Sequence, residues 1–285
     1  MTLVAVWMAE TRLMAIADSR IVRSAGNVLT EHGPKLLPIT VICMQPSQNG
    51  AFDRVVYRSD IGFAYSGATL SALAAHALST TLLSKLIGMP GAPPPALNEL
   101  AHFVAGASAE YMREVGQLAL KNGLFSALVF GWCPREQRLR IFELQPRITD
   151  GQLTVDNMER NLSPIKIGGI AKECAVTIGG GADDFAEEID KELANAKNRG
   201  EVLEIVAFDA PKRALRRMIA EGSNQMIGGV IQQAWATSSG FQILSNLEPI
   251  TPRPPSPRNV GSFILGFDTM DIQTVGSYQV GGLGR

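Results

Sequence analysis

Thr2-Leu3-Val4-Ala5-Val6-Trp7 and Leu13-Met14-Ala15-Ile16-Ala17-Asp18 are two apolar runs that flank the polar turn Met8–Arg12 near the start of the chain. Apolar, β-branched runs of this length predict two buried strands joined as a hairpin. A strand rises ~3.3 Å per residue, so the second strand of a hairpin ends level with the start of the first. The pattern therefore predicts that Asp18 lies beside Thr2, although 16 positions separate them.

This stretch also carries the groups of a hydrolytic site. Once Met1 is removed, Thr2 holds a hydroxyl and a free α-amine on one residue. Asp18 supplies a carboxylate, and Lys35, 17 positions further on, supplies an ammonium. An N-terminal threonine nucleophile needs these groups together. Each residue alone has an ordinary structural explanation, since an Asp at a strand end is commonly a turn former. The hypothesis rests on their combination.

A second feature of the site is the turn Ser66-Gly67. It follows Ile61–Tyr65, a predicted core strand, and it precedes a helical pattern from Leu70 to Leu86. Before that strand, Val55–Tyr57 is predicted to form a separate short strand across a polar turn. A tight turn between a strand and a helix places backbone N–H groups at a helix N-terminus, which favours an anion or a developing oxyanion.

The order of the remaining elements predicts the architecture. Helices are expected from 96 to 121, from 182 to 195 and from Pro211, with strands or hairpins at 125–144, 152–155, 175–178 and 230–244. Strands that alternate with pairs of helices favour two sheets covered by helices over a wound βαβ sheet. The predicted fold class is α+β, a four-layer αββα sandwich. Residues 1–245 are predicted to form this domain, and 246–285 a Pro-rich arm with a C-terminal strand extension.

Composition narrows the function classes. The net charge is −1 and the basic residues are scattered, which argues against a nucleic-acid surface. No apolar run approaches the length of a membrane span, and the N-terminus lacks a basic leader. The three cysteines and three histidines show no metal-ligand spacing, and no phosphate or dinucleotide loop is present. We therefore expect a cytoplasmic protein without metal, cofactor, nucleic-acid partner or membrane partner.

Four pieces of the chain resemble a known family. They are Thr2–Val6, Ala17-Asp18-Ser19-Arg20, Lys35–Ile39 and Ala64–Ala68. In order and spacing they are similar to the proteasome β-subunit group of N-terminal nucleophile hydrolases, including its bacterial ring-forming homologues. The resemblance covers roughly residues 2 to 245 and implies the N-terminal nucleophile hydrolase type of αββα sandwich. It also implies a self-compartmentalising ring of identical chains, a peptide or unfolded protein as substrate, and an unfoldase as a further partner.

The resemblance implies a role for each site residue. Thr2 would attack a peptide carbonyl while its own α-amine takes the proton, directly or through a water. Lys35 would keep the amine neutral by its charge, and Asp18 would orient Lys35. The oxyanion would be held by a backbone N–H at Ser66-Gly67. Ser19 and Ser223 are candidate auxiliary hydroxyls.

The chain departs from the family at its accessory positions. Gly180 stands where the family usually has a serine between two glycines, and Asn224 and Ile227 stand where it usually has an Asp and a Ser. Three functions therefore stay open. The first is an N-terminal threonine peptidase, the second a non-catalytic structural ring protein, and the third a small-molecule amidase on the same fold. A large homo-oligomer would favour a peptidase chamber over the third.

Overall fold

The N-terminal hairpin forms as predicted. In the computed structural model, β1 (Leu3–Ala9) pairs antiparallel with β2 (Arg12–Asp18), with Val4 opposite Ala17. The structure describes residues 3–23, 27–163, 174–222, 224–249, 260–264, 267–268, 274–275 and 278–279. The predicted site residues Thr2 and Ser223 and the prolines from Pro252 to Pro257 lie outside this part of the chain.

The hairpin forms the middle of the first sheet. This sheet has five strands in the order β11-β1-β2-β12-β13, and all of its ladders are antiparallel. The three added strands are β11 (Ala175–Gly179), β12 (Ile231–Thr237) and β13 (Gly240–Leu244). Leu3 lies opposite Gly179, and Asp18 lies opposite Ile231. The start of β1, the end of β2 and the start of β12 therefore lie side by side at one end of the strands of this sheet.

The second sheet has six strands in the order β10-β9-β8-β6-β5-β7. It is mixed, because β5 pairs antiparallel with β6 but parallel with β7. Its strands are β5 (Leu36–Gln45), β6 (Arg54–Gly67), β7 (Leu86–Ile87), β8 (Phe125–Cys133), β9 (Arg138–Thr149) and β10 (Gln152–Glu159). The prediction of two short strands at 55–57 and 61–65 was wrong, since β6 runs unbroken through them.

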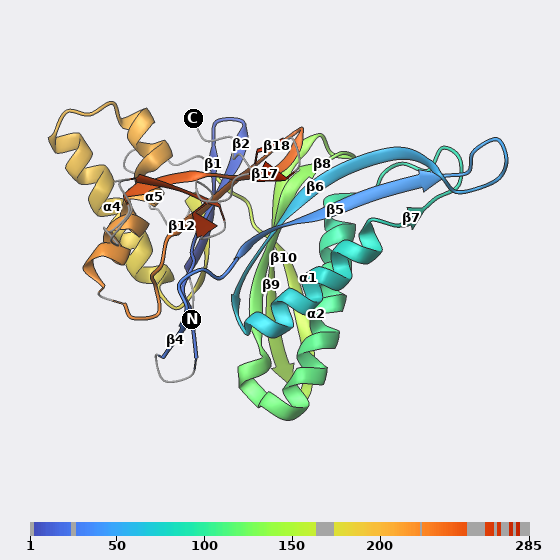
Figure 1. Cartoon of the computed structure of the whole chain (residues 1–285), viewed down its shortest axis with the longest axis horizontal. Helices are drawn as coiled ribbons and strands as arrows, with labels where there is room; N and C mark the ends of the chain where they lie inside the picture. Colours follow the sequence, from blue (N-terminus) through green and yellow to red (C-terminus); the bar gives the residue numbers. More distant parts are fainter. Residues whose placement is uncertain are drawn as a thin grey trace.

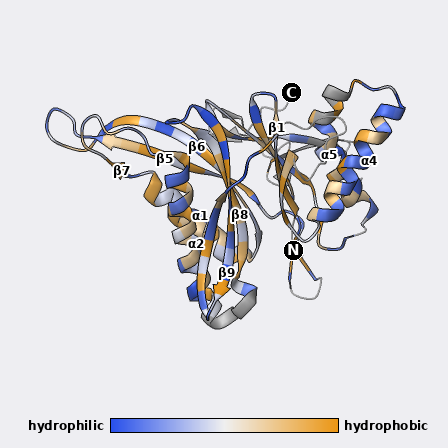
Figure 2. Cartoon of the chain, turned by 180° about the vertical axis from the view of Figure 1, so that it is seen from behind, coloured by the Kyte–Doolittle hydropathy of each residue, from blue (hydrophilic) through white to orange (hydrophobic). Residues whose placement is uncertain are grey.

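Two pairs of helices complete the fold. α1 (Thr69–Leu83) and α2 (Leu97–Ala119), followed by the short 3₁₀ helix η2 (Leu120–Gly123), come before β8. α4 (Ala182–Asn198) and α5 (Leu203–Glu221) come before β12. The predicted start of the last helix near Pro211 was wrong, because α5 begins at Leu203 and contains that proline. Figure 2 shows hydrophilic as well as hydrophobic residues on α4 and α5, as expected for helices with one buried face.

Three groups of buried apolar residues hold these elements together. One joins α4 and α5 to the first sheet, through residues such as Trp7, Phe185 and Leu215. Another lies between strands of the two sheets and includes Val6 and Leu128. The third joins the second sheet to α1 and α2. Figure 1 shows the two helix pairs on opposite sides of the strands. The fold class is thus α+β, built on mixed and antiparallel sheets.

Short strands occupy the rest of the described chain. β3 (Ile21–Val22) and β4 (Val28–Thr30) form a small hairpin directly after Asp18. Beyond β13, β14 (Asn246–Pro249), β15 (Val260–Ile264) and β16 (Phe267–Asp268) form a separate sheet, and β17 (Thr274–Val275) pairs with β18 (Tyr278–Gln279). None of the helices in the described ranges is both long enough and apolar enough to cross a membrane.

Candidate active site

Asp18 is the centre of the candidate site. Its side chain is fully buried, and its Oδ1 accepts hydrogen bonds from the Leu3 amide at 3.0 Å and from Lys35 Nζ at 2.8 Å. Its Oδ2 accepts from the backbone amides of Arg20 at 3.3 Å and Gly228 at 3.1 Å. These four donors occupy both oxygens of the carboxylate. Asp18 therefore joins four segments of the chain.

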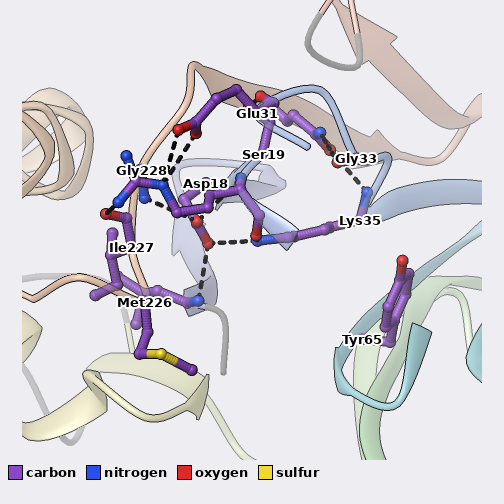
Figure 3. A network of polar contacts seen from close by, with 12 residues as sticks. Asp18, Ser19, Glu31, Gly33, Lys35, Tyr65, Met226, Ile227 and Gly228 are labelled. Atoms are coloured by element: carbon purple, nitrogen blue, oxygen red, sulfur yellow. Dashed lines mark hydrogen bonds and ion pairs between the residues drawn. The ribbon is translucent and has the colours of Figure 1, made fainter. Parts of the chain in front are cut away.

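Lys35 is the second charged member of the site. It directly precedes β5, its side chain is fully buried, and Figure 3 shows it extending toward Asp18. Its Nζ donates to Asp18 Oδ1 and, at 2.6 Å, to the carbonyl oxygen of Arg20. Burial lowers the pKa of Lys35 below its usual range, against the opposing effect of the Asp18 carboxylate. The structure thus brings together Asp18 and Lys35, the two charged residues of the predicted site.

The third predicted residue, Thr2, lies outside the described residues. Its neighbour Leu3 is described, and the Leu3 backbone nitrogen is the atom to which Thr2 is covalently bonded. That nitrogen donates to Asp18 at 3.0 Å. The carboxylate is therefore in contact with the peptide group that joins residues 2 and 3, as the hairpin geometry predicts.

Ser19, the predicted auxiliary hydroxyl, has a structural task in this arrangement. Its Oγ accepts a hydrogen bond from the Val230 amide at 2.8 Å and donates to the carbonyl oxygen of Glu31. Its own amide and that of Arg20 donate to the carbonyl oxygen of Gly228, at 3.2 and 3.0 Å. Ser19 thus ties the segment after β2 to the turn that precedes β12.

The two glycines of this turn lie against neighbouring segments, Gly228 against the end of the Arg20 side chain and Gly229 against backbone as well. A Cβ on Gly228 would lie 2.2 Å from Cζ of Arg20, and a Cβ on Gly229, where φ is +75°, would lie 2.3 Å from Ser19 Oγ. The Arg20 guanidinium lies against the turn, because it donates to the carbonyl oxygens of Gln225 at 2.9 Å and Ile227 at 3.3 Å. Its Nε also pairs with the Glu31 carboxylate at 3.0 Å.

The accessory positions lie close to one another across two turns. Asn224 Nδ2 donates to the Gly180 carbonyl oxygen at 3.4 Å, and its Oδ1 accepts from the Met226 amide at 3.0 Å. Ile227 is 1% exposed and packs in the apolar group under α4 and α5. Its side chain approaches Gly181, where an added Cβ would lie 2.6 Å from Ile227 Cδ1. These positions provide packing and turn contacts, and no hydroxyl or carboxylate.

The predicted oxyanion turn lies at the end of β6. Leu36, the residue after Lys35, is opposite Ala64 in the β5–β6 ladder, and Ser66 and Gly67 follow on β6. Gly67 has a φ of +121°, and a Cβ there would lie 2.6 Å from the Leu124 carbonyl oxygen. The same oxygen accepts from the Ala68 amide at 2.9 Å. The turn is therefore a close backbone approach that only glycine fits.

Sequence reasoning gave no role to three further residues around the site, although Arg20 ends the quoted piece Ala17-Asp18-Ser19-Arg20. Arg20 and Glu31 form the ion pair that lies over the Gly228 turn. Gln232, on β12, donates to the Gly33 carbonyl oxygen at 2.6 Å and accepts from the Lys35 amide at 2.9 Å. An arginine, a glutamate and a glutamine carry no distinctive signal in a single sequence. Only the fold brings them to the site.

Tyr65 supports the Lys35 segment from the second sheet. Its hydroxyl donates to the Pro34 carbonyl oxygen at 2.9 Å, and burial raises its pKa to about 12. Because burial penalises the phenolate, a folded-state pKa above the unfolded value of 10.0 leaves the free energy of unfolding unchanged below pH 10. The free energy of unfolding then falls, by up to about 3 kcal/mol for a shift of this size, as pH rises through the folded pKa.

Replacing Tyr65 tests this contribution. At pH 8, Tyr65→Phe is expected to lower the free energy of unfolding by about 1 kcal/mol, because the Pro34 carbonyl loses its donor. Between about pH 10 and 11.5 the wild type should lose stability relative to Tyr65→Phe until the difference changes sign. Urea unfolding across this range, with Tyr111→Phe as control, measures it. A difference that stays constant with pH would contradict the assignment.

Within the described ranges, no group of three or more His, Cys, Asp or Glu side chains is arranged to hold a metal ion. The cysteines Cys43, Cys133 and Cys174 are free thiols. The arrangement consists of the buried Asp18–Lys35 ion pair, the peptide group of residues 2 and 3, and the turn at Gly228, all in contact through Asp18. Its chemistry is that of a buried carboxylate–ammonium pair.

No protein-family model matches the chain, and no curated protein matches it. Many solved structures are similar to it in fold, among them the following two. An Anbu (Gly-1) mutant from Hyphomicrobium sp. strain MC1 shares 17% identity over 85% of this chain and 84% of that chain, with a TM-score of 0.46. The Anbu complex from Pseudomonas aeruginosa, a helical assembly, shares 15% identity over 81% and 80%, with a TM-score of 0.48.

These findings correct the family expectation. Both similar structures are Anbu proteins, a group distinct from the proteasome β-subunits, so the assignment to the proteasome β-subunit group was wrong. The assignment depended on four short pieces around the site, from Thr2 to Ala68. Such pieces reflect the geometry of a site and say little about the group to which a chain belongs. The accessory positions Gly180, Asn224 and Ile227 already departed from the proteasome pattern.

Proposed function

We propose that this chain is an N-terminal threonine hydrolase that cleaves amide bonds in peptides. In this proposal Met1 is removed, and the Thr2 hydroxyl attacks the substrate carbonyl carbon. The hydroxyl proton passes to the Thr2 α-amine, directly or through a water, and later to the leaving amine. An α-amine has a pKa near ~7.7–8.0, which suits a base at neutral pH. Water then hydrolyses the acyl-enzyme ester and restores the hydroxyl.

The observation that carries the proposal is the shared carboxylate of Asp18. One oxygen, Oδ1, accepts from both the Leu3 amide at 3.0 Å and Lys35 Nζ at 2.8 Å. The Lys35 ammonium and the Leu3 N–H therefore bind the same oxygen. Leu3 directly follows Thr2, the residue that carries the proposed nucleophile. A buried ion pair is costly to form, so its position beside the N-terminal residue favours a chemical role over a purely structural one.

Lys35 supports the reaction by its charge. A cation near an amine favours the neutral form of that amine and stabilises a developing alkoxide. Lys35 has no alternative position, because its Nζ is held by Asp18 and by the Arg20 carbonyl oxygen and its side chain is fully buried. Asp18 fixes this charge in place, and both residues act by positioning and electrostatics.

The Ser66-Gly67 turn is the proposed oxyanion site. Gly67 is exposed, so a substrate carbonyl can approach its backbone. α1 begins two residues later, at Thr69, and a helix N-terminus favours negative charge. Loss of such a backbone donor typically costs about 3–4 kcal/mol of transition-state stabilisation.

We further propose that the protein works as an assembly of identical chains with the four-layer αββα arrangement of helix pairs and sheets. Exposed apolar side chains gather around the far end of the β5–β6 hairpin, namely Phe52, Val55, Val56, Ile87 and Met89. A contiguous exposed apolar patch on a folded protein commonly marks an interaction surface. Unfolded protein as substrate and an unfoldase as partner stay predictions from the sequence.

One observation favours a second candidate, a chain of the same fold without turnover. The accessory positions hold Asn224, which bonds to the Gly180 carbonyl oxygen, and Ile227, which is buried among apolar residues. Neither supplies a hydroxyl or a charge to the site. The experiment below separates the two candidates.

Intact-mass spectrometry before and after treatment with a threonine-directed epoxyketone tests the proposed function. We expect a protein that lacks Met1 and forms one adduct per chain, because the reagent requires both the hydroxyl and the free amine. Thr2→Ala should abolish the adduct and peptide hydrolysis, whereas Thr2→Ser should retain both. The native mass of the same sample reports assembly. Retained Met1 with no adduct would overturn the peptidase proposal and favour the non-catalytic chain.

A further inference from the structure

Gln232 is a buried amide whose side-chain bonds all go to the segment that carries Lys35. The side chain is 1% exposed. Its Oε1 accepts from the backbone amides of Lys35 at 2.9 Å and Leu36 at 3.3 Å, and its Nε2 donates to the Gly33 carbonyl oxygen at 2.6 Å. Two N–H donors on one side and a carbonyl on the other admit a single orientation of this amide.

Side-chain bonds hold much of the segment from Gly33 to Lys35. The β5–β6 ladder begins at Leu36, opposite Ala64, so this ladder supplies no bond to the preceding residues. The Gly33 amide donates to the Ser19 carbonyl oxygen at 2.7 Å, and Tyr65 donates to the Pro34 carbonyl oxygen at 2.9 Å. Gln232 binds the backbone on either side of the Pro34 contact. The bonds to the Lys35 and Leu36 amides come from the Gln232 side chain.

β12 relates this segment to Asp18. Ile231, next to Gln232 on β12, lies opposite Asp18 in the β2–β12 ladder. Neighbouring residues of one strand therefore fix both halves of the ion pair, Asp18 through the ladder of the first sheet and Lys35 through the Gln232 amide at the start of the second sheet.

We propose that Gln232 is a positioning residue for the hydrolytic reaction, which aligns Lys35 with Asp18 beside the N-terminal residue. The inference rests on the proposed function for its catalytic meaning. Gln232 touches neither the nucleophile nor Lys35 Nζ in the bonds above. It acts through the backbone of Lys35, and displacement of a charged group by about 1 Å is enough to cost about 100-fold in rate.

The decisive variant is Gln232→Glu, which has the same shape. When protonated, the Glu carboxyl can accept from the Lys35 amide and donate to the Gly33 carbonyl oxygen, as the amide does. When ionised it cannot donate. Burial and the Asp18 carboxylate raise the pKa of a carboxyl at this position, whereas the Lys35 and Leu36 amides and the Lys35 ammonium lower it. The assay therefore runs from about pH 5 to about pH 9. The rate of Thr2 adduct formation, relative to wild type, should be close to one near pH 5 and lower by about 10-fold or more near pH 9.

Two further variants complete the test. Gln232→Leu removes all three bonds and should lower the relative rate by about 10- to 100-fold at every pH. Gln233→Glu is the matched control, because Gln233 is the adjacent residue of β12 and its Oε1 accepts from Lys212 Nζ at 3.2 Å. This control should keep the wild-type rate and pH profile.

Backbone hydrogen exchange of Lys35 and Leu36 supplies a readout that needs no turnover. Exchange at both amides should accelerate in Gln232→Leu and stay unchanged in Gln233→Glu. Unchanged exchange in Gln232→Leu, or a Gln232→Glu rate ratio that does not vary with pH, would overturn the inference. Failure of the proposed function gives a different result from failure of this inference. The wild type would then form no adduct, while exchange at Lys35 and Leu36 would still respond to Gln232→Leu.

Discussion

Asp18→Asn is expected to lower the free energy of unfolding by about 3–5 kcal/mol, the range found when one partner of a buried ion pair is removed. The variant leaves the Lys35 ammonium fully buried without a counter-charge. The Asn side chain also replaces one carboxylate oxygen with an NH2 group, which would face either the Leu3 amide or the amides of Arg20 and Gly228. Peptide hydrolysis should be lost as well.

The loss should depend on pH in a defined direction. Without Asp18, burial lowers the pKa of Lys35 further, because the largest opposing effect is lost, so the unfolded chain binds more protons than the folded one above that lowered pKa. Stability therefore rises with pH until Lys35 is deprotonated in the unfolded chain as well, near its usual pKa of about 10.4. The deficit of Asp18→Asn should shrink as pH rises toward about 10.

Lys35→Met removes the other member of the ion pair and is compared with Asp18→Asn. It leaves Asp18 with its three backbone N–H donors, which can sustain a buried carboxylate. We expect a smaller loss of stability than for Asp18→Asn, and an equal loss of hydrolysis. Urea unfolding of both variants from pH 6 to 10 measures the asymmetry.

Glu110→Gln is the control for these two variants, since Glu110 pairs with Arg113 on the surface of α2. A surface pair of this kind contributes no more than about 0.5 kcal/mol. A loss of stability in Asp18→Asn as small as that of Glu110→Gln would contradict the reading of Asp18 as the centre of the site.

Gly229→Ala should have the second large effect. Gly229 has a φ of +75°, and a Cβ there would lie 2.3 Å from Ser19 Oγ and 2.4 Å from the Glu31 carbonyl oxygen. The left-handed conformation costs an alanine about 1–2 kcal/mol, and overpacking adds about 1–3 kcal/mol. Because Ser19 and Glu31 belong to the segment between Asp18 and Lys35, the displaced turn should also lower hydrolysis.

Gly200→Ala separates the two contributions. Gly200 has a nearly equal φ of +69°, with nothing within 4 Å of the added Cβ. It should lose only the conformational part, about 1–2 kcal/mol, and keep the activity of the wild type. Thermal unfolding of both variants compares the two losses of stability. Equal losses would show that the Gly229 turn does not press against Ser19 and Glu31.

The parts of the site that could be predicted from the sequence are local ones. Two apolar runs of equal length around a polar turn predict a hairpin, and hairpin geometry brings Asp18 back to the start of the chain. The merging of 55–57 and 61–65 into β6 could not be foreseen, because the polar residues Arg58 to Asp60 between them read as a turn. In the structure they continue the ladder, with Asp60 accepting from Thr40 Oγ1 at 2.6 Å.

The start of α5 was misplaced for a related reason. Proline suits the first turn of a helix, so Pro211 predicted a start there. The packing of α5 against α4 and the first sheet, through residues such as Val206 and Ala210, favours an extra N-terminal stretch. The contacts of Gly228 and Gln232 were also beyond prediction, since they join residues separated by up to 210 positions.

The place of β2 in the first sheet has a consequence for biosynthesis. β2 lies between β1 and β12, and β12 begins at Ile231. During synthesis the hairpin is made first, but one edge of β2 has no strand partner until more than 200 further residues have been added. Such an edge is open to pairing with other chains. The same delay keeps Asp18 without Gly228, so the carboxylate gains its full set of bonds only after residue 228 has been made.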